Sequence, residues 1–296
     1  MDLLGKSLAL ASAVLWAGAV ILFKKAGDRI SPLALNIYKT AVTLLTLLPV
    51  LLLLRVPLWP APGVANGQWL AVAASGVVGI ALADTLFFFA LNLLGAGLAA
   101  IVDSTYTPLV MLSSWLMLAQ TPRPEQIFGG LLVIAAVLVA TLKKDHPQTG
   151  RKLLLGILVG ATAMGMMAVS IGLMGPPLQK APFLWVTFLR QLAALAAMAL
   201  AVLFIPGRGR LFAPLFKSRE SWRYALPGTL LGNTLAMTCW VAAFKFTSAN
   251  SAAVLNQTST VLIVILASIF LKEPFTRRRL LSALLAVAGS TIIMLG

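Results

Sequence analysis

The second half of the chain resembles the first half at a constant offset of 153 residues, and each half carries five long apolar segments. Trp69 matches Trp222, Gly79 matches Gly232 and Thr105 matches Thr258 in one ungapped register. A half that crosses a bilayer five times ends on the side opposite its start. The next half must then be inverted, which is an architecture used by secondary transporters.

Composition places the apolar segments in lipid. Hydrophobic residues make up 60% of the chain and charged residues 10%, and the mean hydropathy is +0.96, far from soluble averages. With about 20 apolar residues per crossing, we predict an all-α integral membrane protein of ten transmembrane helices in two inverted five-helix repeats, at 1–145 and 151–296. The predicted spans are 4–25, 32–54, 68–91, 96–119, 125–142, 153–174, 182–205, 223–245, 249–271 and 278–295.

The strong positive charge points to lipid headgroups. The net charge is +15, and most basic residues lie in short connections without aromatic interleaving, so we expect anionic lipids as partners and no nucleic acid. The only histidine, His146, lies in a charged loop, and the only cysteine, Cys239, lies in an apolar segment. We therefore predict no metal, no cofactor and no enzymatic activity.

Several short motifs resemble a known family. The first span contains Ala-Val-Leu-Trp-Ala around Trp16, followed by Lys24 and Lys25. The second half ends in a pattern of small residues, a short acidic turn and a Gly/Ala-rich helix, which the first half repeats more weakly. The second-half residues are Ser251-Ala252-Ala253, Leu271-Lys272-Glu273-Pro274 and Ala288-Gly289; those of the first half are Ala99-Ala100, Pro108 and Gly129-Gly130, with Gln120 in place of Glu273.

Over essentially its whole length the chain thus resembles the drug/metabolite transporter superfamily, and within it the EamA-type exporters and permeases. That resemblance implies ten helices and the transport of amino acids, other metabolites, drugs or nucleotide-sugars. It leaves the substrate open, because one fold serves many functions.

Two carboxylates fall inside apolar spans, Asp84 and Asp103. A charge facing lipid costs roughly 2.5–3.5 kcal/mol, so each should face a cavity or a partner. Loss of water penalises the charged form, which makes both residues candidates for proton coupling. Either one could instead be half of a salt bridge.

Two basic residues, Lys39 and Arg190, also lie inside spans, at nearly equivalent places separated by 151 residues. They could hold a substrate carboxylate or phosphate near the pseudo-two-fold axis. Alternatively, they pair with Asp84, Asp103 or backbone carbonyls, or lie near the membrane interface.

The stretch around Asp103 is polar at mid-membrane depth, because Tyr106 and Thr107 follow at helical spacing and Pro108 weakens the helix. Its repeat mate is Asn256, beside Gln257. Such groups line a cavity or join helices to each other. The predicted substrate-binding residues are Trp16, Tyr38, Lys39, Asp103, Tyr106, Thr107, Arg190, Trp240, Asn256 and Gln257, and further candidates for the pocket wall are Met164, Met166, Met167 and Trp185.

The basic residues are divided unequally between the two ends of the predicted bundle. The N-terminus and even-numbered connections hold 5 Lys and Arg, and the odd-numbered connections hold 16. The positive-inside rule then places both termini outside, whereas the family that the chain resembles usually has a cytoplasmic N-terminus. We expect a monomer in a bacterial cytoplasmic (inner) membrane.

From these patterns we predict a secondary-active transporter, and specifically an exporter, of a small zwitterionic or anionic, amino-acid-like metabolite, working by alternating access with protons as a possible second partner. A facilitative exchanger or a permease for lipids and amphiphiles is the alternative.

Overall fold

The computed structural model describes residues 2–56, 58, 67–118, 121–141, 150–217, 219–247, 252 and 255–295. Gln120, His146, Ser251 and Ala253, named above, lie outside the described residues. Within the described part, each of the ten predicted spans is helical, and the protein is an integral, multi-pass membrane protein.

The first half contains five helical spans. They are α1 (Asp2–Gly27); α2 (Pro32–Leu53); α3 (Gln68–Gly76), η1 (Val77–Ala83) and α4 (Asp84–Leu94) in series; α5 (Ala96–Asp103) and α6 (Tyr106–Leu118) in series; and α7 (Pro124–Thr141).

The second half repeats this order. Its helices are α8 (Gly150–Lys180); α9 (Phe183–Leu203); the short connecting α10 (Arg208–Lys217); α11 (Arg219–Gly228), η2 (Thr229–Ala236) and α12 (Met237–Phe246) in series; α14 (Thr258–Phe270); and α15 (Arg277–Leu295).

Length and hydropathy agree with a membrane location. Six helical spans in the described residues are long and apolar enough to cross a bilayer, namely Asp2–Gly27, Pro32–Leu53, Gln68–Leu94, Pro124–Thr141, Gly150–Lys180 and Phe183–Leu203. Two shorter apolar helices cover Ala96–Leu112 and Thr258–Phe270. Large side chains such as Leu45 (71% exposed) and Leu200 (58%) point outward, as expected of a surface solvated by lipid.

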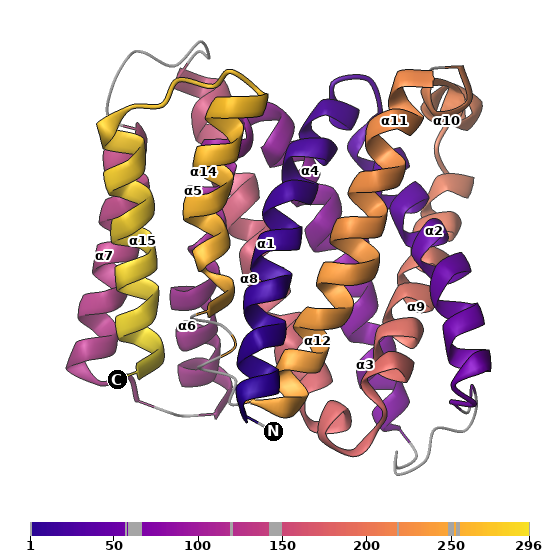
Figure 1. Cartoon of the computed structure of the whole chain (residues 1–296), viewed down its shortest axis with the longest axis horizontal. Coiled ribbons are helices and arrows are strands. Elements are labelled where there is room, and N and C mark those ends of the chain that lie inside the picture. Colours follow the sequence, from indigo (N-terminus) through magenta and orange to yellow (C-terminus); the bar gives the residue numbers. More distant parts are fainter. Residues whose placement is uncertain are drawn as a thin grey trace.

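The two halves run in opposite directions. Both chain ends lie at the lower edge of the bundle in Figure 1. The side chain of Asn92, near the end of α4, donates a hydrogen bond to the Gly27 carbonyl at the end of α1 (3.2 Å). Gly156, near the start of α8, packs against Leu94 at the same end of α4. The second half therefore begins at the end of the bundle where α1 finishes.

Helices α7 and α15 form a close antiparallel pair at one side of the bundle (Figure 1). A Cβ added to Gly289 would lie 2.6 Å from the Gly129 carbonyl oxygen, and the reverse distance is also 2.6 Å. Small residues let two backbones approach closely in a membrane, where association depends on van der Waals contact.

The third span of each half is not a continuous α-helix. A π-helical turn interrupts both spans, at η1 and at η2, which start within one residue of the repeat offset. A π-helix changes the i→i−4 pattern and is frequent at functional sites. Side chains satisfy the carbonyls there, since Asn36 donates to Ile80 O (2.7 Å) and Ser12 donates to Ala236 O (2.9 Å).

The fourth span of each half is broken as well. In the first half α5 ends at Asp103 and α6 begins at Tyr106, and in the second half α14 begins only after Gln257. Pro108 has no N–H for the Ser104 carbonyl, which accepts a 3.3 Å hydrogen bond from the Thr107 N–H instead. The single straight helices that the sequence predicts at 68–91, 96–119 and 223–245 are thus each divided.

Candidate functional site

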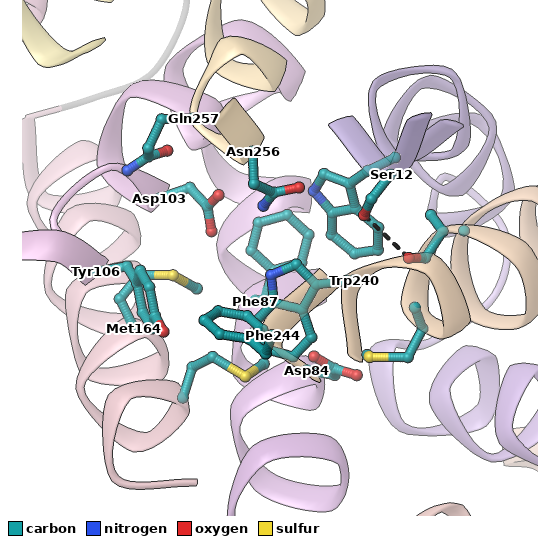
Figure 2. A pocket seen from close by; sticks show the side chains of 15 residues that line it. Ser12, Asp84, Phe87, Asp103, Tyr106, Met164, Trp240, Phe244, Asn256 and Gln257 are labelled. Atoms are coloured by element: carbon teal, nitrogen blue, oxygen red, sulfur yellow. Dashed lines mark hydrogen bonds between the residues drawn. The ribbon is translucent and has the colours of Figure 1, made fainter. Parts of the chain in front are cut away.

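A central cavity opens beside these helix breaks and takes side chains from both halves. It encloses about 800 Å³, including its open mouth. Figure 2 shows the side chains around it, with Asp103, Asn256 and Gln257 along one edge and Asp84 at the other. The lining residues are Ser12, Trp16, Asp84, Phe87, Asp103, Tyr106, Met164, Met167, Gly232, Ala236, Met237, Trp240, Phe244, Asn256 and Gln257.

Aromatic rings form much of the cavity wall. The Trp16 and Phe87 rings lie 5.9 Å apart between centroids, and those of Trp240 and Phe244 meet edge to face at 5.0 Å. Met164 and Met167 from α8 and Met237 from α12 add soft thioether surface. The wall is therefore apolar and polarisable, with a few polar groups set into it.

Asp84 is held by a buried ion pair. It is the first residue of α4, and its Oδ2 accepts a 2.6 Å hydrogen bond from the Lys39 ammonium of α2. Lys39 also donates to Asn233 Oδ1 (3.0 Å) in η2, and Asn233 donates to Thr43 Oγ1 (2.9 Å). Lys39 and Asp84 are 2% and 6% exposed. Both belong to the first repeat, and the bond from Lys39 to Asn233 links this buried pair to the second repeat.

Arg190 occupies the matching place in α9 without a carboxylate. It is 1% exposed, and its guanidinium donates to Ser170 Oγ (3.0 Å) and approaches Met174 Sδ (2.8 Å), both in α8. Among the described residues no ion pair joins Arg190 to an acid, and its Nε has no hydrogen-bond partner. Met237 stands where a mate of Asp84 would stand in the repeat.

Asp103 differs from Asp84 because its carboxylate has no partner among the described residues. It ends α5, and Figure 2 shows its oxygens directed into the cavity. Its repeat mate Asn256 also lines the cavity and has an unpaired Oδ1. Gln257 is held in place, since its amide donates to Thr107 Oγ1 (3.0 Å) and Ser290 Oγ (3.3 Å).

Comparison with known families agrees with this two-repeat geometry. The model of the EamA-like transporter family matches residues 3–142 and again residues 152–295. The chain belongs to the EamA-like transporter family. Its resemblance to that branch of the drug/metabolite transporter superfamily is thereby confirmed, and the chain is a member of a transporter family.

Individual relatives agree with the assignment to the EamA-like family and name no substrate. The chain is 27% identical over 151 residues to the uncharacterized transporter sll1319 of Synechocystis sp. (strain ATCC 27184 / PCC 6803 / Kazusa), a match that covers 50% of this chain and 44% of the relative. The chain thus spans less than half the length of that relative. A crystal structure described only as that of a protein is similar in fold, with a TM-score of 0.72, 17% identity and coverage of 99% of this chain and 96% of that one.

The EamA-like cavity brings together most of the predicted site residues. Those that line it are Trp16, Asp84, Asp103, Tyr106, Trp240, Asn256 and Gln257, with Met164 and Met167 beside them. The remaining predictions lie outside the lining, and these are Tyr38, Lys39, Thr107, Arg190, Met166 and Trp185.

Physical reasons account for the residues outside the lining. Lys39 is occupied by Asp84 and Asn233, and Tyr38 packs its ring edge-on against Trp222 at 5.3 Å. Thr107 faces Gln257 as a hydrogen-bond acceptor. Of the alternatives left open for Lys39, the structure shows the ion pair with Asp84, and a contact of Lys39 with substrate stays a prediction.

Sequence reasoning did not single out several lining residues, among them Ser12, Phe87, Ala236 and Phe244. Helical spacing offers a signal for two of them, because residues three or four apart share a face. Ser12 is four residues before Trp16, and Phe87 is three residues after Asp84. Ala236 carries no chemical signal of its own.

Proposed function

We propose that this EamA-like protein is a secondary-active transporter, rather than an enzyme, that moves a small organic solute by alternating access. The observation that carries the proposal is the position of the cavity, which both repeats line beside their broken helices. Transporters of inverted-repeat design bind substrate at the repeat interface and rock one repeat against the other.

The make-up of the cavity lining supports a small organic solute. Small-molecule sites are concave and mostly apolar, with a few polar groups at set positions, and this cavity has an aromatic and thioether wall that also carries Asp103, Asn256 and Gln257. Of the predicted amino-acid-like solute, the ammonium group matches the acidic lining, whereas the carboxylate has no lining cation among the described residues. Export remains our proposed direction. An anionic solute gains less support, since Lys39 and Arg190 lie outside the lining.

We propose Asp103 as the main proton-coupling residue, with Asp84 in a secondary role. Among the described residues, the titratable side chains that line the cavity are Asp84, Asp103 and Tyr106. Asp84 already has a cation 2.6 Å away, so its protonation would leave Lys39 buried without a counter-charge. Asp103 has no such partner and can take up a proton at lower cost.

A cysteine-accessibility experiment tests alternating access without knowledge of the substrate. Met167 lines the cavity, and a Met167→Cys variant in a Cys239→Ala background carries one reactive thiol. A membrane-impermeant maleimide should label this thiol in right-side-out vesicles and also in inside-out vesicles. Labelling from one side only, under every pH gradient, would contradict the proposal.

The same thiol reports proton coupling. An imposed pH gradient should change the ratio of labelling from the two sides, and this change should be lost in Asp103→Asn and reduced in Asp84→Asn. Asp28→Asn is the matched control, because Asp28 forms an exposed ion pair with Lys24 at the end of the bundle. A wild-type response in both cavity variants would exclude coupling through these carboxylates.

A second candidate function is the movement of lipids or other amphiphiles, by a permease or a facilitative exchanger. The five aromatic and three methionine side chains of the lining favour it. Reconstitution in vesicles that contain a fluorescent phospholipid separates the two functions. Lipid transfer between leaflets that depends on the protein would support the permease, and its absence supports solute transport.

For the membrane location we propose that a single chain works as a monomer in the cytoplasmic membrane with both termini outside. The cavity is lined within one chain, and the odd-numbered connections carry most of the basic residues. A reporter fused to the C-terminus that is active only in the cytoplasm should stay inactive. An active reporter would show that the C-terminus is cytoplasmic, which contradicts the proposed orientation.

A further inference from the structure

The charge of the cavity narrows the chemistry of its ligand. Two carboxylates, Asp84 and Asp103, belong to the lining, and no Lys, Arg or His among the described residues does. Lys39 already balances Asp84 from behind the wall. Asp103 is therefore the one lining carboxylate that has no cation within 4.0 Å among the described residues, and the buried Arg190 acts only at longer range, on Asp84 and Tyr106.

An uncompensated carboxylate in an apolar cavity attracts a cation. A carboxylate that leaves water loses the free energy of its hydration, and only a hydrogen bond or an ion pair replaces it. No described residue forms such an interaction with Asp103. Its side chain is partly exposed to the cavity, where an ammonium group can reach it. The neighbouring Asn256 Oδ1 is also unpaired and offers a second acceptor for an ammonium N–H.

The cavity wall suits the remainder of such a ligand. Aromatic faces attract cations through the ring quadrupole, most strongly for tryptophan, and Trp16 and Trp240 both line the cavity. Phe87 packs against Trp16, and Phe87 and Phe244 lie beside Trp240 (Figure 2). Methionine thioethers adapt to varied apolar shapes. A protonated amine on an aromatic or other apolar body matches both the charge and the wall.

The described part of the lining offers no cation to an anionic ligand. The Lys39 ammonium is engaged by Asp84 and Asn233, and the Arg190 guanidinium is directed at Ser170 and Met174 in α8. A ligand carboxylate would meet only neutral donors and the negative field of Asp103. Like charges close together in a low dielectric repel strongly.

We propose that the central cavity selects an organic cation, a protonated amine on an apolar or aromatic body, and that Asp103 is its counter-ion. This inference rests on the proposed transport function and names the substrate class of the same cavity. Asp84 is not proposed as a counter-ion of the ligand, because its carboxylate already forms an ion pair with Lys39.

Three probes with one carbon skeleton test the selection by charge. Phenethylamine, L-phenylalanine and 3-phenylpropionate share a phenylethyl body and differ only in the ammonium and carboxylate groups. Binding to the purified, detergent-solubilised protein can be measured by calorimetry and by the fluorescence of tryptophans at the cavity. We expect phenethylamine to bind at least about tenfold more tightly than 3-phenylpropionate, as one charge-assisted hydrogen bond implies.

Substitution of Asp103 provides the decisive variant. Asp103→Asn should weaken phenethylamine binding by about 10- to 100-fold and leave the weak binding of 3-phenylpropionate unchanged or stronger. Asp28→Asn, the same chemical change at an exposed ion pair, should bind all three probes like wild type. Similar unfolding temperatures of the two variants show that the loss is not one of folding.

Three results would overturn the inference. They are equal or tighter binding of 3-phenylpropionate, wild-type affinity of Asp103→Asn for phenethylamine, and no binding of any probe. Labelling of Met167→Cys from the two membrane sides requires no ligand, so alternating access can hold while amine selection fails. The two proposals therefore fail separately.

Discussion

The two repeats have the same arrangement of helices and helix breaks, and they differ in the charged side chains beside those breaks. Both have a π-helical turn in the third span and a break in the fourth, at equivalent places. The first repeat has Asp84 and Asp103 beside these features, and the second has Met237 and Asn256 at the same positions. The buried cations are retained in both, as Lys39 and Arg190, but only Lys39 has a carboxylate within 4.0 Å in the described residues.

This difference separates two requirements on such a transporter. A frame of two similar halves can adopt two conformations that mirror each other, which alternating access needs. Recognition of a solute with one ammonium group requires a single carboxylate, and therefore a cavity whose two halves differ in charge. The backbone of the two repeats is similar here, and the side chains that differ are Asp84 and Asp103 in the first repeat and Met237 and Asn256 in the second.

The largest expected effect comes from the two buried cations. Lys39→Met leaves Asp84 buried without a partner and should destabilise the protein by about 3–5 kcal/mol. Arg190→Met removes a cation that pairs with no described acid, so it should cost less than about 1 kcal/mol or stabilise. Unfolding of the detergent-solubilised variants measures both.

The double variant Lys39→Met/Asp84→Met is the control for this contrast, because it removes both charges and should regain most of the stability. Equal costs for Lys39→Met and Arg190→Met would show that the two cations have equivalent environments.

A smaller effect is expected at Glu273, which has Gln120 as its counterpart in the first repeat. Glu273 accepts hydrogen bonds from the backbone N–H groups of Ala96 (2.7 Å) and Gly97 (3.1 Å) at the start of α5, and it pairs with Arg279 (3.2 Å). Glu273→Gln removes the charge from this helix N-terminus and should cost about 1–2 kcal/mol in unfolding measurements.

Glu125→Gln is the matched control for Glu273, since Glu125 is exposed in the first turn of α7. It should change stability by less than about 0.5 kcal/mol. If the Glu273 and Glu125 variants were equally stable, the cap on α5 would contribute nothing.

The smallest contrast concerns the π-helical turns. Asn36 in α2 bonds to Ile80 O in η1. Thr187 in α9 lies 151 residues later, the same offset as Arg190 from Lys39, and its hydroxyl bonds to Phe183 O in its own helix (2.9 Å). Asn36→Leu should cost about 0.6–1.7 kcal/mol, the range of polar bonds between membrane helices. Thr187→Val should be close to neutral. Hydrogen exchange of η1 should rise in the Asn36 variant alone, and protection equal to wild type would contradict the role of Asn36.

Much of the fold was predictable from sequence. Apolar length marks each span, and the odd number of spans per repeat implies the inversion, because both follow from the thickness of a bilayer. The π-helical turns were not predictable, since Val77–Ala83 has no proline and reads as an ordinary apolar helix. The side chain that bonds to a carbonyl of this turn, Asn36, comes from another helix.

The candidate site was predictable in part. Asp103, Asn256 and Gln257 follow from polarity in an apolar span, and all three line the cavity. Lys39 and Arg190 carry the same sequence signal but lie outside the lining. The direction of a buried side chain depends on how its helix is rotated against neighbouring helices, which the sequence does not specify. For Lys39, the ion pair with Asp84 sets the direction of the side chain.

Moving the cavity acid from one repeat to the other tests most directly whether this charge selects the ligand. Asp103→Asn alone should lower the affinity for phenethylamine by about 10- to 100-fold. Asp103→Asn/Asn256→Asp places the acid at the equivalent lining position and should regain most of the lost affinity and the preference over 3-phenylpropionate. A folded double variant that binds phenethylamine no better than Asp103→Asn would contradict the account.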